Sequence, residues 1–379
     1  MQSELSSSTF PWTWDEVTGW CRACRELSPT ETAAGVVAIA HLRKVFGEDF
    51  SCFPPRLFAN LLNQAGWIYR WLDWLSRSLR DLESCRGFDA LIARLVDRDR
   101  FEEALSVLET ADRFFGAGFS VSFDVPVRIG DVDKVPDLHV VDPDTRTSFD
   151  CEISVMYRSH EDRKAAERSS RLFYSILNAA GDLTFCGRLL RVISDARTEE
   201  LATQISEAIA FARDRGCLAE VIVPQVMEFA VAPSSNNEIL AWCRARDLEP
   251  GSFGAPMPQT NELRRLQVKI EQEEKQLPSG QPNALVIHGQ DLFNDLDDPV
   301  RRLHDVEEVV LDHPKIALLV VCADMLGHQP PRVVLGPPGM FVVSNRGDVM
   351  RHLLVVENRR CASVAPDSVV RKLRLAFTL

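Results

Sequence analysis

The chain has 379 residues, of which 45% are hydrophobic and 26% charged, and its 43 Lys and Arg against 55 Asp and Glu give a net charge of −12. This composition is typical of a globular protein and excludes collagen-like, coiled-coil and intrinsically disordered chains. No apolar stretch approaches the ~20 residues that span a bilayer, and the N-terminal residues lack the features of a signal peptide. We therefore expect a cytoplasmic protein without a membrane partner. The acidic balance argues against non-specific coating of nucleic acid, while a local basic groove stays possible.

Residues 1–100 show a helical pattern, because apolar residues recur three and four positions apart in AGVVAIAHLRKVF and LFANLLNQAGWIYRWLDWLSRSL. We therefore predict an α-helical N-terminal region. Trp67, Trp71 and Trp74 fall on one face of one predicted helix. Such a stripe is typical of a core or of a contact with a partner helix. A protein partner or a second copy of the chain, bound through these helices, is one hypothesis for this region.

Beyond residue 100 the pattern alternates between helices and strands. The segment FEEALSVLETADRFFGAGF predicts a helix, and VSFDVPV, VPDLHVVD and TSFDCEISVM predict three strands. Helical segments then alternate with apolar runs such as NALVIHG. Residues 233–260 are rich in Pro, Gly, Ser and Asn and predict a loop insertion. We therefore predict an α/β domain over residues 101–379, with a central mixed sheet flanked by helices.

The ten cysteines show no repeating spacing, which argues against a disulfide framework in a chain of this length. Cys21 and Cys24 have the CxxC spacing of zinc and redox sites. No second CxxC or His pair follows at the distance that a zinc finger requires, and the surrounding pattern is helical. We therefore interpret both cysteines as buried structural residues.

Two acidic residues lie on consecutive predicted strands. Asp137 follows Pro136, and Glu152 lies on the strand after the Asp142-Pro143-Asp144 turn. On adjacent antiparallel strands these carboxylates can lie side by side, an arrangement that Mg²⁺ or Mn²⁺ stabilises by taking their oxygens as ligands. A metal held in this way polarises a phosphoryl oxygen and lowers the pKa of a bound water. The alternative is that both acids are half-exposed strand residues without a function.

The stretch from Phe101 to Met156 resembles the metal-binding core of the PD-(D/E)XK nuclease superfamily, the restriction-endonuclease-like fold. Pro136-Asp137 matches the PD motif, Glu152 the second acid, and Glu109 an additional acid on the preceding helix. The helix before NALVIHG resembles a later element of such proteins. The resemblance implies that Asp137 and Glu152 are metal ligands, that Glu109 supports them, and that the fold is restriction-endonuclease-like.

One position departs from this family. The superfamily has a lysine two residues after the second acid, where its ammonium orients or activates the attacking water. This chain has Ser154 there, which can donate a hydrogen bond but carries no charge. Lys164 on the following helix and Lys134 before the PD pair are candidate replacements. Arg158 is a third candidate, although a guanidinium stays protonated and cannot act as a base.

The resulting hypothesis is a Mg²⁺- or Mn²⁺-dependent nuclease that hydrolyses phosphodiester bonds in DNA. Two groups of basic residues could line a nucleic-acid groove, one in the helix after Glu152 and one in the C-terminal stretch from Arg351 to Arg374. His139 lies two residues beyond Asp137 on the same predicted strand; a role near the metal is one interpretation, and a packed or hydrogen-bonded core histidine is the simpler one. The alternative, favoured by Ser154, is a nuclease-like protein that has lost catalysis and acts as a binding or assembly module.

Overall fold

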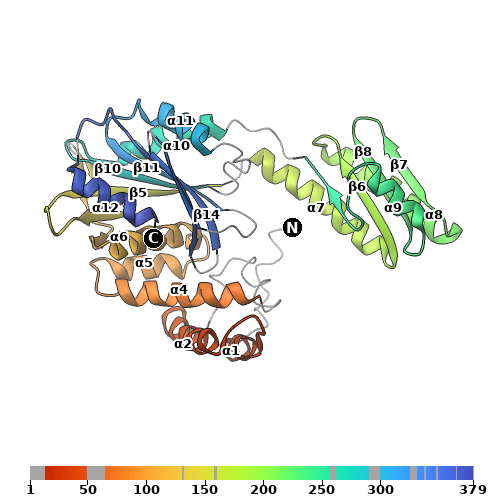
Figure 1. Cartoon of the computed structure of the whole chain (residues 1–379), viewed down its shortest axis with the longest axis horizontal. Helices are drawn as coiled ribbons and strands as arrows, with labels where there is room; N and C mark the ends of the chain where they lie inside the picture. Colours follow the sequence, from red (N-terminus) through yellow and green to blue (C-terminus); the bar gives the residue numbers. More distant parts are fainter. Residues whose placement is uncertain are drawn as a thin grey trace. The chain divides into compact units, whose positions relative to one another are not determined.

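A computed structural model describes residues 13–48, 65–129, 132–157, 160–256, 262–289, 299–324, 331–336, 339–346, 349–363 and 365–378. The chain divides into two units. The first combines Met1–Tyr157 with Glu262–Leu379, and the second is Arg158–Asn261 (Figure 1). None of the described helices is both long and apolar enough to cross a membrane.

The first unit begins with helices, as the periodicity predicts. They are α1 (Trp14–Ala23), α2 (Pro29–Phe46), α4 (Gly66–Leu82), α5 (Phe88–Leu95) and α6 (Phe101–Gly116). The first two start at capping boxes, in which Thr13 and Ser28 exchange hydrogen bonds with the glutamate three residues later. These reciprocal bonds satisfy amide groups that have no partner inside the helix.

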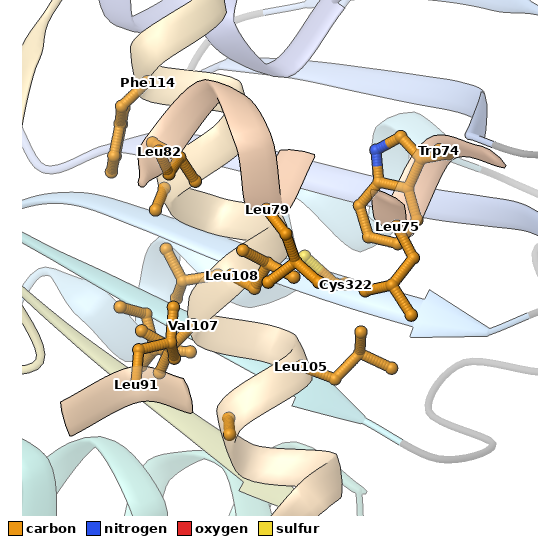
Figure 2. Close-up of a cluster of buried hydrophobic side chains, with 14 of the residues drawn as sticks. Trp74, Leu75, Leu79, Leu82, Leu91, Leu105, Val107, Leu108, Phe114 and Cys322 are labelled. Carbon is orange, nitrogen blue, oxygen red and sulfur yellow. The ribbon is translucent and has the colours of Figure 1, made fainter. Parts of the chain in front are cut away.

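The tryptophan stripe of α4 belongs to the core of the first unit. Trp71 and Trp74 are buried, and Trp67 is partly buried against the same core. Leucines of α4 and α6 interleave beside Trp74 (Figure 2). That core is continuous with side chains of the sheet, so the N-terminal helices are not a domain of their own. The predicted boundary at residue 100 is therefore absent, because α6 is packed against α4 and α5 as well as against the sheet.

The described residues of the first unit form a mixed sheet, as predicted, and it has eight strands. Its strands, in spatial order, are β1 (Ser120–Phe123), β4 (Leu138–Val141), β5 (Ser148–Met156), β10 (Asn283–Gly289), β11 (Ile316–Asp324), β14 (Val349–Glu357), β13 (Gly339–Arg346) and β12 (Arg332–Gly336). Strands β5, β10 and β11 are parallel, and the other neighbours are antiparallel. A separate hairpin joins β2 (Val127–Ile129) to β3 (Val132–Lys134).

Helices cover both faces of this sheet (Figure 1). One face carries α6 and α12 (Asp367–Thr378), and the other carries α10 (Glu262–Glu273), the 3-10 turn η1 (Glu274–Gln276) and α11 (Pro299–Val310). Side chains of β5 alternate between the faces: Cys151 and Ile153 join the core under α6, and Met156 joins the core under α10. Glu152 and Ser154 therefore point to the α10 face.

The second unit has a sheet and a core of its own. Its elements are α7 (His160–Ala180), β6 (Leu183–Leu189), α8 (Asp195–Arg215), β7 (Ala219–Val223), β8 (Met227–Pro233), α9 (Asn237–Arg244) and β9 (Phe253–Gly254). Leu172, Ile205 and Phe229 are buried together between its helices and sheet. The predicted domain over residues 101–379 is thus two units, because the second is inserted in the chain between β5 and α10. The predicted loop at 233–260 contains a helix and a short strand.

Candidate functional site

The two acids of the PD-(D/E)XK-like pattern lie at the same end of one strand ladder. Strands β4 and β5 are antiparallel and their ladder ends with Leu138 facing Cys151; Asp137 directly precedes Leu138 and Glu152 directly follows Cys151, so both acids lie at this end of the ladder. The short connection between the two strands fixes this register. The structure therefore brings together the two residues that the sequence predicts to be neighbours.

Both carboxylate oxygens of Asp137 have protein partners. Arg94 of α5 donates a hydrogen bond of 2.9 Å to Oδ1, and the backbone amide of Ile153 donates one of 3.0 Å to Oδ2. Arg94 also forms an ion pair with Asp124. Burial raises the pKa of Asp137, and the bonds from Ile153 and Arg94 oppose this rise. These contacts hold the carboxylate in one orientation beside β5 and leave each oxygen a further lone pair.

Glu152 is a buried carboxylate with an unsatisfied oxygen. Only 9% of the residue is exposed, and its Oε2 has no hydrogen-bond partner in the part of the chain that the structure describes. Burial, followed by the charges of Asp137 and Glu273, raises its pKa to about 9, whereas Lys269 lowers it. Such a group holds a proton at neutral pH, unless a cation compensates its charge.

Helix α10 brings a lysine and a third acid to this position. Glu273 Oε1 accepts a hydrogen bond of 3.0 Å from the hydroxyl of Ser154 and lies 2.7 Å from Nζ of Lys269. Lys269 also acts on the pKa of Glu152. A cation is thus present beside the two acids although residue 154 is a serine. Sequence reasoning missed Lys269 and Glu273, because their (i, i+4) spacing shows only that they share a helix face.

Glu109 is not close to this site. It lies on α6, and its carboxylate is paired with Arg351 of β14 at 2.8 Å and with Arg113 at 3.3 Å. Arg351 shares a strand face with Leu353, which belongs to the core under α6, so Glu109 is on the opposite face of the sheet from Glu152. The prediction that Glu109 supports the metal ligands is therefore wrong, because its charge is used in a buried ion cluster.

The described structure associates none of the predicted replacements for the motif lysine with the two acids. Lys164 is an exposed residue of α7 in the second unit. Lys134 ends β3 and is partly buried, and Arg158 lies outside the described residues. Neither Lys164 nor Lys134 appears among the described groups that act on Glu152. Lys269 is thus the lysine that the described structure associates with the acids.

His139 lies beside the two acids as a hydrogen-bonded histidine. Its Nδ1 is 2.8 Å from Oδ1 of buried Asp150, which faces it across the β4–β5 ladder. The other oxygen of Asp150 accepts a hydrogen bond of 2.8 Å from the Gln281 amide. The expected hydrogen bond of His139 is present, but the side chain is 30% exposed, so His139 is not a core residue.

Most of the C-terminal basic residues form ion pairs within the protein. Four of them pair with acids of the first unit. These are Arg359 with Glu307, Arg360 with Asp312, Lys372 with Asp142, and Arg374 with Glu357. On α7, Arg168 and Arg171 both bind Asp195. Much of the positive charge that favoured a nucleic-acid groove is therefore compensated within the protein.

The donor set at Asp137 and Glu152 fits a magnesium ion better than a zinc ion. Mg²⁺ uses one or two carboxylates and keeps several waters, whereas structural zinc sites require four protein ligands. Nowhere in the described ranges do three or more His, Cys, Asp or Glu side chains form a metal-binding group. The orphaned Oε2 of Glu152 offers the ligand atom that such an ion requires.

The CxxC pair is structural, as expected. Cys21 and Cys24 are buried in the core of the first unit. Burial raises the pKa of Cys21 to about 11, so the thiolate that a metal or redox site needs is disfavoured.

Comparison with known proteins found no match for this chain among protein-family models, curated proteins or solved structures.

Proposed function

We propose that the first unit is a Mg²⁺- or Mn²⁺-dependent nuclease of the restriction-endonuclease-like type that hydrolyses phosphodiester bonds in DNA. The observation that carries this proposal is the buried oxygen of Glu152, which has no hydrogen-bond partner in the described structure and belongs to a carboxyl next to Asp137 at the end of the β4–β5 ladder. A carboxylate in this state is stabilised by a cation, and a hard divalent cation prefers oxygen ligands.

The order and pairing of elements support the proposal. Helix α6 precedes the antiparallel strands β1, β4 and β5, and α10 precedes the parallel strand β10. This is the helix, three strands, later helix and buried strand to which the sequence resemblance points. Glu152 lies on β5 and Asp137 directly precedes β4, positions that are compatible with those of the two motif acids in the family.

The residues around the acids have distinct roles in this proposal. Asp137 and Glu152 hold the metal, which when bound supplies Lewis-acid polarisation of the phosphate and a more acidic water. Lys269 supplies the positive charge that the motif lysine provides in the family, and it offsets charge developing on the phosphate. An ion pair with Glu273 positions the Lys269 ammonium, and a hydrogen bond from the Ser154 hydroxyl positions the Glu273 carboxylate. Arg94 and the amide of Ile153 orient Asp137.

The side chains around the two acids are partly exposed. The side chains of Asp137 and Glu273 are 15% and 13% exposed, and those of Lys269 and His139 are 25% and 30% exposed. A phosphate therefore approaches past the lysine and the histidine. This favours a substrate whose backbone projects into the site, such as single-stranded DNA or a DNA end, over continuous duplex.

Incubation of the purified full chain with labelled single-stranded DNA, duplex DNA and RNA, in Mg²⁺ or Mn²⁺, tests the proposal. We expect DNA cleavage that EDTA stops and that Asp137→Asn and Glu152→Gln each abolish without changing the circular dichroism spectrum. Glu271→Gln, on the exposed side of α10, is the matched control and should cleave normally. Cleavage that survives both site substitutions would contradict the proposal.

A second candidate function is that of a catalytically inactive binding or assembly module. Two observations favour it: Ser154 replaces the motif lysine, and Arg94 already binds Asp137 Oδ1. An arginine in this place compensates the carboxylate without a metal. This candidate predicts neither cleavage nor metal affinity.

A further inference from the structure

We propose that Arg94 controls the entry of the divalent cation: its guanidinium occupies Asp137 Oδ1 in the metal-free protein and moves to Asp124 when the ion binds. This inference rests on the proposed nuclease function and adds a regulatory residue that the motif does not contain. It starts from one guanidinium that lies between two carboxylates. Nη1 donates a hydrogen bond of 2.9 Å to Asp137 Oδ1, and Nη2 lies 3.2 Å from Asp124 Oδ1.

Oδ1 of Asp137 is the atom for which Arg94 and a metal ion compete. The other oxygen, Oδ2, accepts a hydrogen bond of 3.0 Å from the amide of Ile153, which holds the carboxylate beside β5. A cation that binds Oδ1 therefore shares this oxygen with the guanidinium. The side chains of Arg94 and Asp137 are only 12% and 15% exposed, and like charges repel more strongly where water is largely excluded. Metal binding thus favours a position of Arg94 away from Oδ1.

Asp124 offers the guanidinium another partner close by. It directly follows β1, and its backbone amide donates a hydrogen bond of 3.1 Å to the carbonyl oxygen of Asp137. Its side chain is 27% exposed, more than that of Asp137. Arginine can bind one carboxylate through two parallel hydrogen bonds. Because Nε of Arg94 has no hydrogen-bond partner among the described residues, Arg94 can bind Asp124 through Nε and Nη2.

The backbone near Arg94 is anchored, which confines the movement to the side chain. The amide of Phe123, the last residue of β1, donates a hydrogen bond of 2.8 Å to the carbonyl oxygen of Arg86. The next residue, Gly87, caps α5 with a positive φ of 83°, and a Cβ there would overlap the carbonyl oxygen of Phe123. Helix α5 therefore stays docked on the end of β1, next to Asp124.

Calorimetric titration of Mn²⁺ into the metal-free full chain tests the exchange. Arg94→Gln removes the competitor and should bind Mn²⁺ at least about 5-fold more tightly than wild type, the lower end of the usual coupling between two ligands. Asp124→Asn removes the other partner of Arg94 and should bind Mn²⁺ more weakly, while asparagine tolerates the positive φ of 48° at this position. Arg98→Gln, at an exposed arginine four residues later, is the matched control and should bind as wild type.

A measurement on the wild type covers the case in which a variant does not fold. In ¹H–¹⁵N NMR spectra, the Nε–Hε resonance of Arg94 should shift when Mg²⁺ is added, because Nε gains a carboxylate partner. A resonance that does not change at saturating Mg²⁺ would overturn the proposal.

The outcomes separate this inference from the proposed function. If wild type binds Mn²⁺ and folded Arg94→Gln binds it with equal or lower affinity, Arg94 only orients Asp137, and this inference is overturned while the nuclease proposal stands. Binding by Arg94→Gln and not by wild type is the strongest form of the expected result, since the guanidinium then excludes the ion. If neither folded protein binds Mn²⁺, the proposed metal site fails, and this inference fails with it.

Discussion

Ser154 donates a hydrogen bond of 3.0 Å to Glu273, a residue 119 positions later in the chain. The same carboxylate oxygen of Glu273 lies 2.7 Å from Nζ of Lys269. The strand position at which the nuclease family has a lysine is therefore linked, through one glutamate, to a lysine that comes from α10. This relationship explains how a serine at the motif position is compatible with a positive charge beside Glu152.

Lys269→Met is expected to reduce DNA cleavage by about 10²–10³-fold, because it removes a charge that stabilises the transition state. The affinity for Mn²⁺ should not fall, since the lysine is not a metal ligand. Lys275 is an exposed lysine of η1, and Lys275→Met is the control for the loss of a lysine. Single-turnover cleavage rates of the three proteins make the comparison. Equal rates for Lys269→Met and wild type would show that this ammonium has no catalytic role.

A lysine placed at the motif position should replace Lys269. In the Lys269→Met background, Ser154→Lys introduces an ammonium next to Glu273, with which it can form the ion pair that Lys269 forms in the wild type. We expect the double variant to cleave DNA faster than Lys269→Met alone, after circular dichroism has shown that both are folded. If the folded double variant recovers no activity, an ammonium at position 154 does not replace the ammonium of Lys269.

The metal-free protein is expected to lose stability as pH rises, because folding raises the pKa of Glu152 from 4.5 to about 9. Between these pH values the carboxyl is ionised in the unfolded chain and protonated in the folded chain. The resulting loss of unfolding free energy is small below pH 4.5 and grows toward pH 9. In EDTA at pH 8, Glu152→Gln should therefore be more stable than wild type, by about 1–3 kcal/mol. Urea titrations at pH 4.5 and pH 8 measure the difference.

Adding Mg²⁺ at pH 8 should make the wild type more stable than Glu152→Gln, because the ion stabilises the folded wild type according to its affinity and concentration. Glu271→Gln, whose carboxyl is exposed, is the control and should follow wild type in both conditions. If, in EDTA, the free energy of unfolding differs between Glu152→Gln and wild type by the same amount at pH 4.5 and at pH 8, the buried, unpaired state of the Glu152 carboxyl is contradicted.

Glu109→Gln is expected to destabilise the fold and to leave metal affinity unchanged. The substitution removes the negative charge between Arg113 and Arg351 in a buried cluster, a change that costs roughly 3–5 kcal/mol when a buried ion pair is broken. Denaturant unfolding and Mn²⁺ titration of the folded variant separate the two effects. A Glu109→Gln variant of normal stability that no longer binds Mn²⁺ would show that Glu109 does contribute to metal binding.

Part of this structure could be predicted from local patterns. The short connection between β4 and β5 favours antiparallel pairing, which brings Asp137 and Glu152 to the same end of the two-stranded ladder. The tryptophan spacing on α4 likewise predicts burial. Patterns of this kind depend only on residues close in the chain.

The remaining features depend on contacts between distant segments. Lys269 reaches Glu152 only because α10 packs on the sheet face that Glu152 shares, and the whole second unit separates the two in sequence. The error at Glu109 has a related origin. Helix α6 is buried almost all around, so its periodicity does not indicate which acid faces which partner. The sequence pattern does not predict the boundaries of the second unit, because helices and strands alternate in both units.

Calorimetric titration of Mn²⁺ into the metal-free full chain tests the central claim most directly. The account predicts one site per chain in the wild type and in Glu271→Gln, and loss of that site in both Asp137→Asn and Glu152→Gln. Absence of binding by folded wild-type protein, or a site that persists in both variants, would contradict the claim that these two carboxylates hold a divalent cation.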